Sequence, residues 1–159
     1  MIALSLAEAQ LFRLLVSLFG TDQVLPHLSV MGICGGELPS LPKVNSITND
    51  DLAIWARNNK CLFTVVDRND NPKIVLEFFA GFEDSIDTIE EEHVRILPPL
   101  FGTYGIHYIT MSKDEFNDIL DPGNAFDLVA FLRAKLGHED ENSHSLTWAS
   151  GRDNPQDID

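Results

Sequence analysis

The sequence predicts an α/β domain with a mixed sheet of about four strands and helices on both faces. Helix-like and strand-like segments alternate along the chain in the order helix, strand, helix, hairpin, helix, strand, helix. Two consecutive strand-like segments are almost continuously apolar, as in strands that are covered on both faces. Hydrophobic residues make up 44% and charged residues 23% of the 159 residues, close to globular averages. One ordered domain over residues 1–137 accounts for these observations.

The first half of the chain is predicted to hold two helices and a short strand. Ser5 and Glu8 have the spacing of a capping box, and Gly20 is placed to end the helix that they begin. Residues 23–33 are predicted to form a strand, and Pro26 within it favours an edge position because proline donates no hydrogen bond. The elements expected next are a glycine- and proline-rich loop over 34–46 and a helix over 48–58.

The clearest prediction is a β-hairpin in the middle of the chain. Residues 61–67 (CLFTVVD) and 73–79 (KIVLEFF) are rich in β-branched and aromatic side chains. Residues 68–72 (RNDNP), between them, are typical of a turn. Because both strands are nearly continuous in apolar residues, we expect them at the centre of the sheet.

The second half is predicted to add a strand between amphipathic helices. An acidic helix over 86–97 is expected to end or kink at Pro98 and Pro99. A buried strand is predicted over 106–111. The elements that complete this half are a helix that begins with the capping-box pattern at Ser112 and ends before Pro122, a helix over 125–136, and an acidic, disordered tail over 138–159.

Charge and cysteine content argue against several classes of protein. The chain has 11 basic and 25 acidic residues, and a formal charge of −14 repels the phosphate backbone of nucleic acids. Cys34 and Cys61 lie in no CxxC or Cys/His pattern, which excludes a disulfide framework and argues against zinc. The apolar N-terminus carries charged residues at helical spacing and no basic leader, so we expect neither a signal peptide nor a membrane span. The expected location is the cytoplasm.

The order of elements resembles the PD-(D/E)XK restriction-endonuclease-like fold: a leading helix with an acid, a strand hairpin ending in an acid, and then helix, strand and helix. Within that fold, the pattern over residues 4–137 is similar to very-short-patch-repair-like and DUF2726-type domains. The resemblance implies a three-layer core. It also implies a site with an acid early in the first hairpin strand, a (D/E)xK triplet in the second, and often an acid on the leading helix. Such acids hold Mg²⁺ against a phosphate, because Mg²⁺ needs several oxygen ligands.

Two of the three core positions of this pattern hold apolar residues in this chain, where the pattern requires an acid and a lysine. By the resemblance, Glu77 occupies the position of the triplet acid, Phe79 that of the lysine, and Leu62 that of the first acid. The hairpin spacing independently places Leu62 or Phe63 across from Glu77. The resemblance therefore implies an inactive relative of the nucleases.

Each candidate residue has a structural interpretation beside the functional one. Glu77 is either a remnant metal ligand or a structural acid, paired with a basic residue or exposed at the end of a strand, because a lone buried carboxylate is costly. Asp67 is either a displaced ligand or a turn residue, and Glu8 is either the helix acid of the site or the acid of a capping box. Arg95 could replace the missing lysine, but the preferred interpretation is a solvated charge on its helix.

The first hypothesis is therefore a non-catalytic nuclease-like domain that acts as a protein-interaction, regulatory or assembly subunit and needs no cofactor. Its predicted docking surface for a basic protein partner is the acidic helix at Glu90, Glu91 and Glu92, with the acidic tail. The alternative is a Mg²⁺- or Mn²⁺-dependent phosphodiesterase in which Glu77, Asp67 and Glu8 hold the metal. A third hypothesis is an acidic mimic of nucleic acid.

Overall fold

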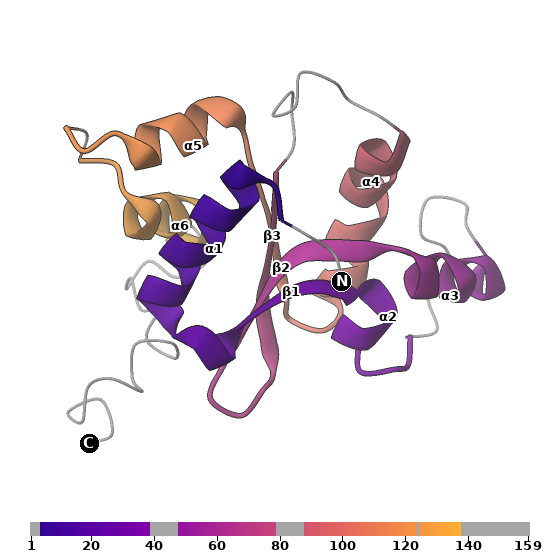
Figure 1. Ribbon diagram of the computed structural model, residues 1–159. Coiled ribbons are helices and arrows are strands. Elements are labelled where there is room, and N and C mark those ends of the chain that lie inside the picture. The colour runs from indigo at the N-terminus through magenta and orange to yellow at the C-terminus, as the bar shows by residue number, and fades with distance from the viewer. Residues whose placement is uncertain (1–3, 39–47, 79–87, 124, 138–159) are drawn as a thin grey trace.

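The computed structural model describes residues 4–38, 48–78, 88–123 and 125–137, and these form a three-layer α/β core (Figure 1). A four-stranded mixed sheet lies between two layers of helices. The predicted fold class, with about four strands and helices on both faces, is confirmed. The side chains of residues 49 and 88–90 are outside the description, as is the predicted tail over 138–159.

The sheet has the strand order β1-β2-β3-β4. β2 pairs antiparallel with both β1 and β3, and β4 runs parallel to β3. The predicted hairpin lies at the centre, and the predicted proline-containing strand lies at an edge, as expected. The strands are β1 (Val24–Ser29), β2 (Lys60–Val66), β3 (Pro72–Phe78) and β4 (His107–Met111).

Each face of the sheet has its own hydrophobic cluster and its own helix layer (Figure 1). On one face, Leu11, Leu15 and Phe19 of the first helix pack with Phe131 and Leu132 of the last one. This layer consists of α1 (Leu6–Phe19), α5 (Lys113–Leu120) and α6 (Leu128–Leu136). The other face is covered by α2 (Val30–Ile33), α3 (Asn49–Asn58) and α4 (Thr88–Gly102), and a 3-10 turn, η1 (Thr21–Gln23), leads into β1.

Both predicted capping boxes are present. The Glu8 backbone N–H donates to Ser5 Oγ at 3.2 Å, and the Ser5 backbone N–H donates to Glu8 Oε1 at 2.9 Å. Ser112 and Glu115 exchange the same two bonds at the start of α5. These bonds satisfy backbone donors that have no partner within the helix, which explains why α1 and α5 begin where they do.

The acidic helix predicted over 86–97 does not end at Pro98 and Pro99. This boundary is wrong, because α4 continues to Gly102. A proline inside a helix costs about 3 kcal/mol. Leu100 and Phe101, which follow, are both 0% exposed, and full burial of such side chains contributes about 1.5–3 kcal/mol each. Burial of these two side chains therefore offsets the prolines, which lie on the exposed side of the helix.

Two further predicted boundaries are corrected by caps that the sequence pattern did not reveal. The strand predicted over 23–33 ends at Ser29, whose hydroxyl accepts the Gly32 backbone N–H at 2.9 Å and begins α2. The helix predicted over 125–136 begins instead at Leu128, because Asp127 accepts the Ala130 backbone N–H at 2.9 Å. In both cases a short polar side chain fixes where the helix starts.

Candidate functional site

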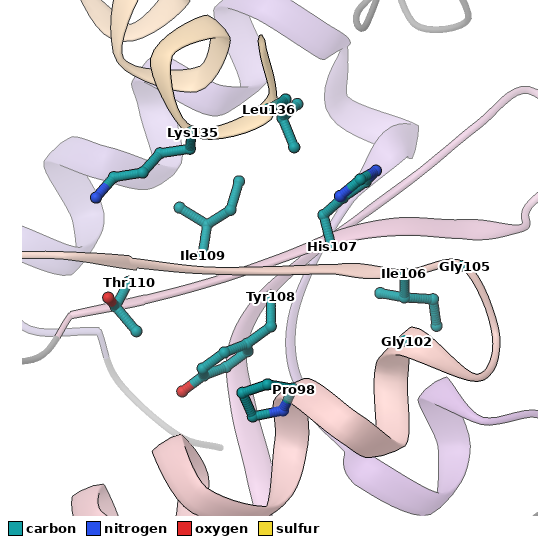
Figure 2. Close-up of a pocket in the computed structure, with 10 residues that line it drawn as sticks. All are labelled: Pro98, Gly102, Gly105, Ile106, His107, Tyr108, Ile109, Thr110, Lys135 and Leu136. Atoms are coloured by element: carbon teal, nitrogen blue, oxygen red, sulfur yellow. The ribbon is translucent and has the colours of Figure 1, made fainter. Parts of the chain in front are cut away.

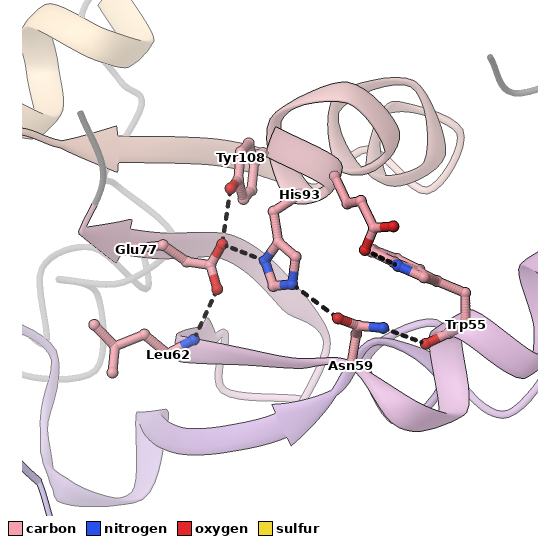
Figure 3. A network of polar contacts seen from close by, with 7 residues as sticks. Trp55, Asn59, Leu62, Glu77, His93 and Tyr108 are labelled. Atoms are coloured by element: carbon pink, nitrogen blue, oxygen red, sulfur yellow. Dashed lines mark hydrogen bonds and ion pairs between the residues drawn. The ribbon is translucent and has the colours of Figure 1, made fainter. Parts of the chain in front are cut away.

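The candidate site centres on Glu77, a carboxylate on the central strand β3 that is 5% exposed. Its Oε1 lies 2.9 Å from His93 Nδ1 on α4 and accepts the Tyr108 hydroxyl of β4 at 2.7 Å. Its Oε2 accepts the Leu62 backbone N–H of β2 at 3.2 Å. Figure 3 shows these contacts converging on the carboxylate from three other elements. Both oxygens of Glu77 are therefore engaged.

Both ring nitrogens of His93 face hydrogen-bond acceptors. Asn59 Nδ2 donates to the Trp55 carbonyl at 3.0 Å, so Asn59 Oδ1 is the atom that faces His93 Nε2, at 3.3 Å (Figure 3). An amide oxygen and a carboxylate are both acceptors. In its doubly protonated form His93 donates to both, and Glu77 and His93, with side-chain exposures of 7% and 4%, then make a buried ion pair.

This pair explains how a carboxylate is accommodated on an apolar strand. A carboxylate buried without a partner costs several kcal/mol or takes up a proton. Here an opposite charge and two further donors compensate the lost hydration. Of the two sequence interpretations of Glu77, the geometry matches the structural acid with a basic partner.

The sheet is irregular at the level of Glu77. The β2–β3 register runs from Phe63 opposite Leu76, and continuing it places Leu62 opposite Glu77, one of the two predicted neighbours. The Leu62 N–H bonds to the Glu77 side chain. On the other side of β2, His27 has a φ of 57° and is left out of the β1–β2 pairs, although the register is the same at Pro26 and Leu28 on either side of it. The Glu77 side chain thus occupies a place where the ladder is opened.

Asp67 has a local role in the turn between β2 and β3. Its Oδ1 accepts the backbone N–H groups of Asn69 at 2.8 Å and Asn71 at 3.0 Å, and Lys73 Nζ lies 3.9 Å from Oδ2. Partial burial favours the neutral acid, but the Asn71 and Asn69 hydrogen bonds together with Lys73 outweigh it and lower the pKa of Asp67. Five residues of strand separate Asp67 from the level of Glu77, which is about 16 Å.

Glu8 lies in the opposite helix layer from the partners of Glu77. Its carboxylate caps α1, which packs on the face with Leu11 and Leu15, whereas His93 lies on α4 across the sheet. The structure therefore does not bring Glu77, Asp67 and Glu8 together. Among the described residues, no three His, Cys, Asp or Glu side chains are grouped as metal ligands.

The residues around Glu77 do not fit the Mg²⁺ or Mn²⁺ that the nuclease resemblance implies. Mg²⁺ requires near-octahedral oxygen ligands, and in proteins it is usually bound through one or two carboxylates with water. The groups within hydrogen-bond distance of Glu77 are a phenol, a backbone N–H and a histidine that donates to it. Both ring nitrogens of His93 are engaged, by Glu77 and by Asn59, so the ring directs no lone pair toward a cation at this carboxylate.

The acidic residues of α4 differ from one another in exposure. Glu91 is exposed, while Glu92 is half-buried and accepts the Trp55 indole N–H through Oε1 at 3.1 Å. Glu90 lies on α4, but its side chain is outside the description. Arg95, the candidate substitute for the missing lysine, is exposed on the same helix. The Trp55–Glu92 bond ties α4 to α3, so at least one of these acids has a structural role.

Sequence reasoning missed the partners of Glu77, although the signals were present. His93 lies three and four residues before Ile96 and Leu97, on the apolar side of its helix, and a histidine can supply the counter-charge of a buried acid. Tyr108 alternates with buried residues in a short strand. What the pattern lacked was the parallel β3–β4 register, which sets Glu77 opposite Thr110 and so close to Tyr108.

The two cysteines are buried thiols without catalytic character. Burial raises the pKa of Cys34 to about 11, and a hydrogen bond with Tyr104 offsets only part of this effect. Burial, followed by the charge of Glu77 and by Cys34, also raises the pKa of Cys61. Since the thiolate is the reactive form, neither side chain is an activated nucleophile at neutral pH.

Comparison of the chain with protein-family models, with curated proteins and with solved structures finds no match. Within the described residues, the helices are too short or too polar to cross a bilayer.

Proposed function

We propose that this chain is a non-catalytic, nuclease-like domain that binds another protein. The observation that carries the proposal is the engagement of Glu77, the one acid at a core position of the nuclease pattern, by His93, Tyr108 and the Leu62 N–H. The three-layer core and the apolar residue opposite Glu77 support the same proposal. In this account the carboxylate holds β2, β3, β4 and α4 together instead of holding a metal.

The surface proposed for the partner is the outer side of the α3–α4 layer. Ile54 on α3 and Val94 on α4 are large apolar side chains that are 53% and 50% exposed. Exposed acids, Asp50, Asp51 and Glu91, lie on the same two helices. Apolar residues with a charged rim are typical of protein interfaces, and the acids favour a basic partner. Of the predicted acidic surface at Glu90, Glu91 and Glu92, the residue described as exposed is Glu91, which is the acid of α4 proposed to face the partner.

The test is capture of protein partners by the full chain and by two matched double variants. Ile54→Ser with Val94→Ser alters the proposed surface, and Leu6→Ser with Leu120→Ser removes exposed apolar side chains from the opposite helix layer. We expect the first variant to lose a partner that the second one retains. A partner set that is the same for wild type and both variants would contradict this surface.

The acidic part of the surface is tested separately by salt and by charge reversal. Glu91→Lys is expected to slow association with a basic partner and to reduce its dependence on ionic strength. Asp118→Lys on α5 makes the same charge change in the other layer, where Asp118 is also exposed. If both variants slow association equally, the net charge of the chain matters and the α4 surface does not.

A further inference from the structure

A groove of about 560 Å³ runs along β4, the edge strand on the far side of the sheet from β1. Figure 2 shows that its lining residues lie on both sides of this strand. Residues from Gly105 to Thr110 form its floor, and the ends of α4 and α6 form its walls through Pro98, Gly102, Lys135 and Leu136. The groove therefore follows the backbone of an edge strand.

The two edges of the sheet differ in how well they resist pairing with another strand. At the β1 edge, Pro26 has no N–H to donate, and His27 adopts a left-handed conformation with a φ of 57°. Both features protect an edge against an added strand. β4 has the sequence HYITM, without proline and without a residue of positive φ. No described strand lies beyond it, so β4 is the edge suited to accept one.

The two walls of the groove have different chemistry. On the α6 side, Lys135 and His107 lie above the strand with Leu136 (Figure 2). On the α4 side, Tyr108 faces Pro98, and Gly102 leaves open space because a Cβ built there meets nothing within 4 Å. The lining includes no carboxylate, although the chain has 25 acidic residues. This groove is thus a non-acidic site on a strongly acidic protein.

Lys135 supplies the positive charge of the groove. Its Nζ lies 3.3 Å from Glu115 Oε2 and 5.3 Å from the centre of the Phe131 ring, and its side chain is 36% exposed. An ammonium group has three N–H donors, so the Glu115 contact leaves capacity for a second carboxylate.

We propose that the β4 edge binds an extended peptide segment of a partner, in which acidic and apolar residues alternate. The segment adds a fifth strand, and its backbone pairs with β4. Because successive side chains of a strand point to opposite sides, its acidic residues face Lys135 and its apolar residues face Tyr108, Pro98 and Gly102. This inference is separate from the α3–α4 surface and does not depend on it.

The probe is an octapeptide of four Val-Glu repeats, acetylated and amidated, titrated into the ¹⁵N-labelled full chain. We expect saturable shifts of the amide signals between Gly105 and Met111, with the amides near Ile54 and Val94 unchanged. The same peptide with every second amide nitrogen methylated cannot pair with an edge strand and is expected not to bind. A peptide of Val-Lys repeats is expected to bind at least about threefold more weakly, as for loss of an exposed ion pair.

Two variants locate the site on the protein. Gly102→Leu adds a side chain on the α4 side of the groove, where a Cβ meets nothing within 4 Å, and is expected to abolish binding. Lys135→Glu is expected to weaken binding of the Val-Glu peptide and to leave the fold intact, since Lys135 is exposed. Absence of saturable shifts, shifts outside β4, equal binding of the methylated peptide, or no effect of Gly102→Leu would each overturn the proposal. Equal binding of the Val-Lys peptide would overturn its acidic specificity.

Discussion

Glu77 and Asp67 are two carboxylates of one hairpin, and the fold uses them in different ways. Glu77 accepts hydrogen bonds from β2, β4 and α4, and its charge is met by His93 at 2.9 Å. Asp67 accepts its hydrogen bonds from residues within four positions of itself, in an exposed turn. Glu77 thus joins distant parts of the chain, whereas Asp67 orders one turn.

This difference shows why an acid on a β-hairpin is weak evidence for a metal site. The same residue type is explained here by a buried ion pair in one place and by turn hydrogen bonds in the other. Loss of the buried Glu77–His93 pair is expected to lower the free energy of unfolding more than loss of the Asp67 hydrogen bonds in the exposed turn.

The largest effect is expected from loss of one member of the buried pair. His93→Ala leaves Glu77 buried with no counter-charge and should lower the free energy of unfolding by about 3–5 kcal/mol, measured by urea denaturation. Val94→Ala, one position along and exposed, is the control and should change stability by less than about 0.5 kcal/mol. A His93→Ala effect as small as that of Val94→Ala would mean that the pair is not formed.

The second prediction tests whether the contributions of Glu77 and His93 to stability are coupled. Replacement of both residues, as Glu77→Gln with His93→Gln, should cost less than the sum of the two single replacements, because no lone charge remains buried. A coupling free energy above about 1 kcal/mol in this double-mutant cycle is expected. Additive effects would indicate that Glu77 and His93 contribute independently.

A smaller and pH-dependent effect is expected at Asp67. Its pKa in the folded protein is lowered from 3.8, so its ionised form stabilises the fold above that pH, and this contribution is lost as the pH falls through the folded-state pKa. Asp67→Asn should therefore cost about 1 kcal/mol at pH 7. The difference between variant and wild type should shrink below pH 3.8. A difference that stays constant from pH 7 to pH 3 would contradict this role.

The smallest effect in the comparison is expected at Glu8, the third metal candidate. Glu8→Gln keeps an oxygen that can accept the Ser5 N–H, so it should change stability by only a few tenths of a kcal/mol. Ser5→Ala removes the side chain that caps α1 and should cost about 1 kcal/mol. If Glu8→Gln were the costlier of the two, a role beyond the capping box would be indicated.

The elements that could be predicted well from the sequence are those determined by residues close together in the chain. The hairpin followed from β-branched runs around an Asn/Asp/Pro turn, and both capping boxes followed from a serine and a glutamate three residues apart. The end of α4 could not be predicted in this way. There the burial of Leu100 and Phe101 in the tertiary structure overrides two prolines.

The candidate site could be predicted only in part, for a related reason. The position of Glu77 and its apolar neighbour Leu62 followed from hairpin register. Its partners did not, since His93 is 16 residues away and Tyr108 is 31 residues away in sequence. They meet Glu77 only because β4 returns parallel to β3 and α4 packs over the same face, which no local pattern specifies.

Calorimetric titration of Mn²⁺ into the purified full chain tests the central claim, that Glu77 is a structural acid and not a metal ligand. Wild type and Glu77→Gln are compared under the same conditions, so that weak binding to other surface acids is common to both. The account predicts no saturable heat that depends on Glu77. Saturable binding by wild type that Glu77→Gln abolishes would contradict it and would support the metal-dependent phosphodiesterase.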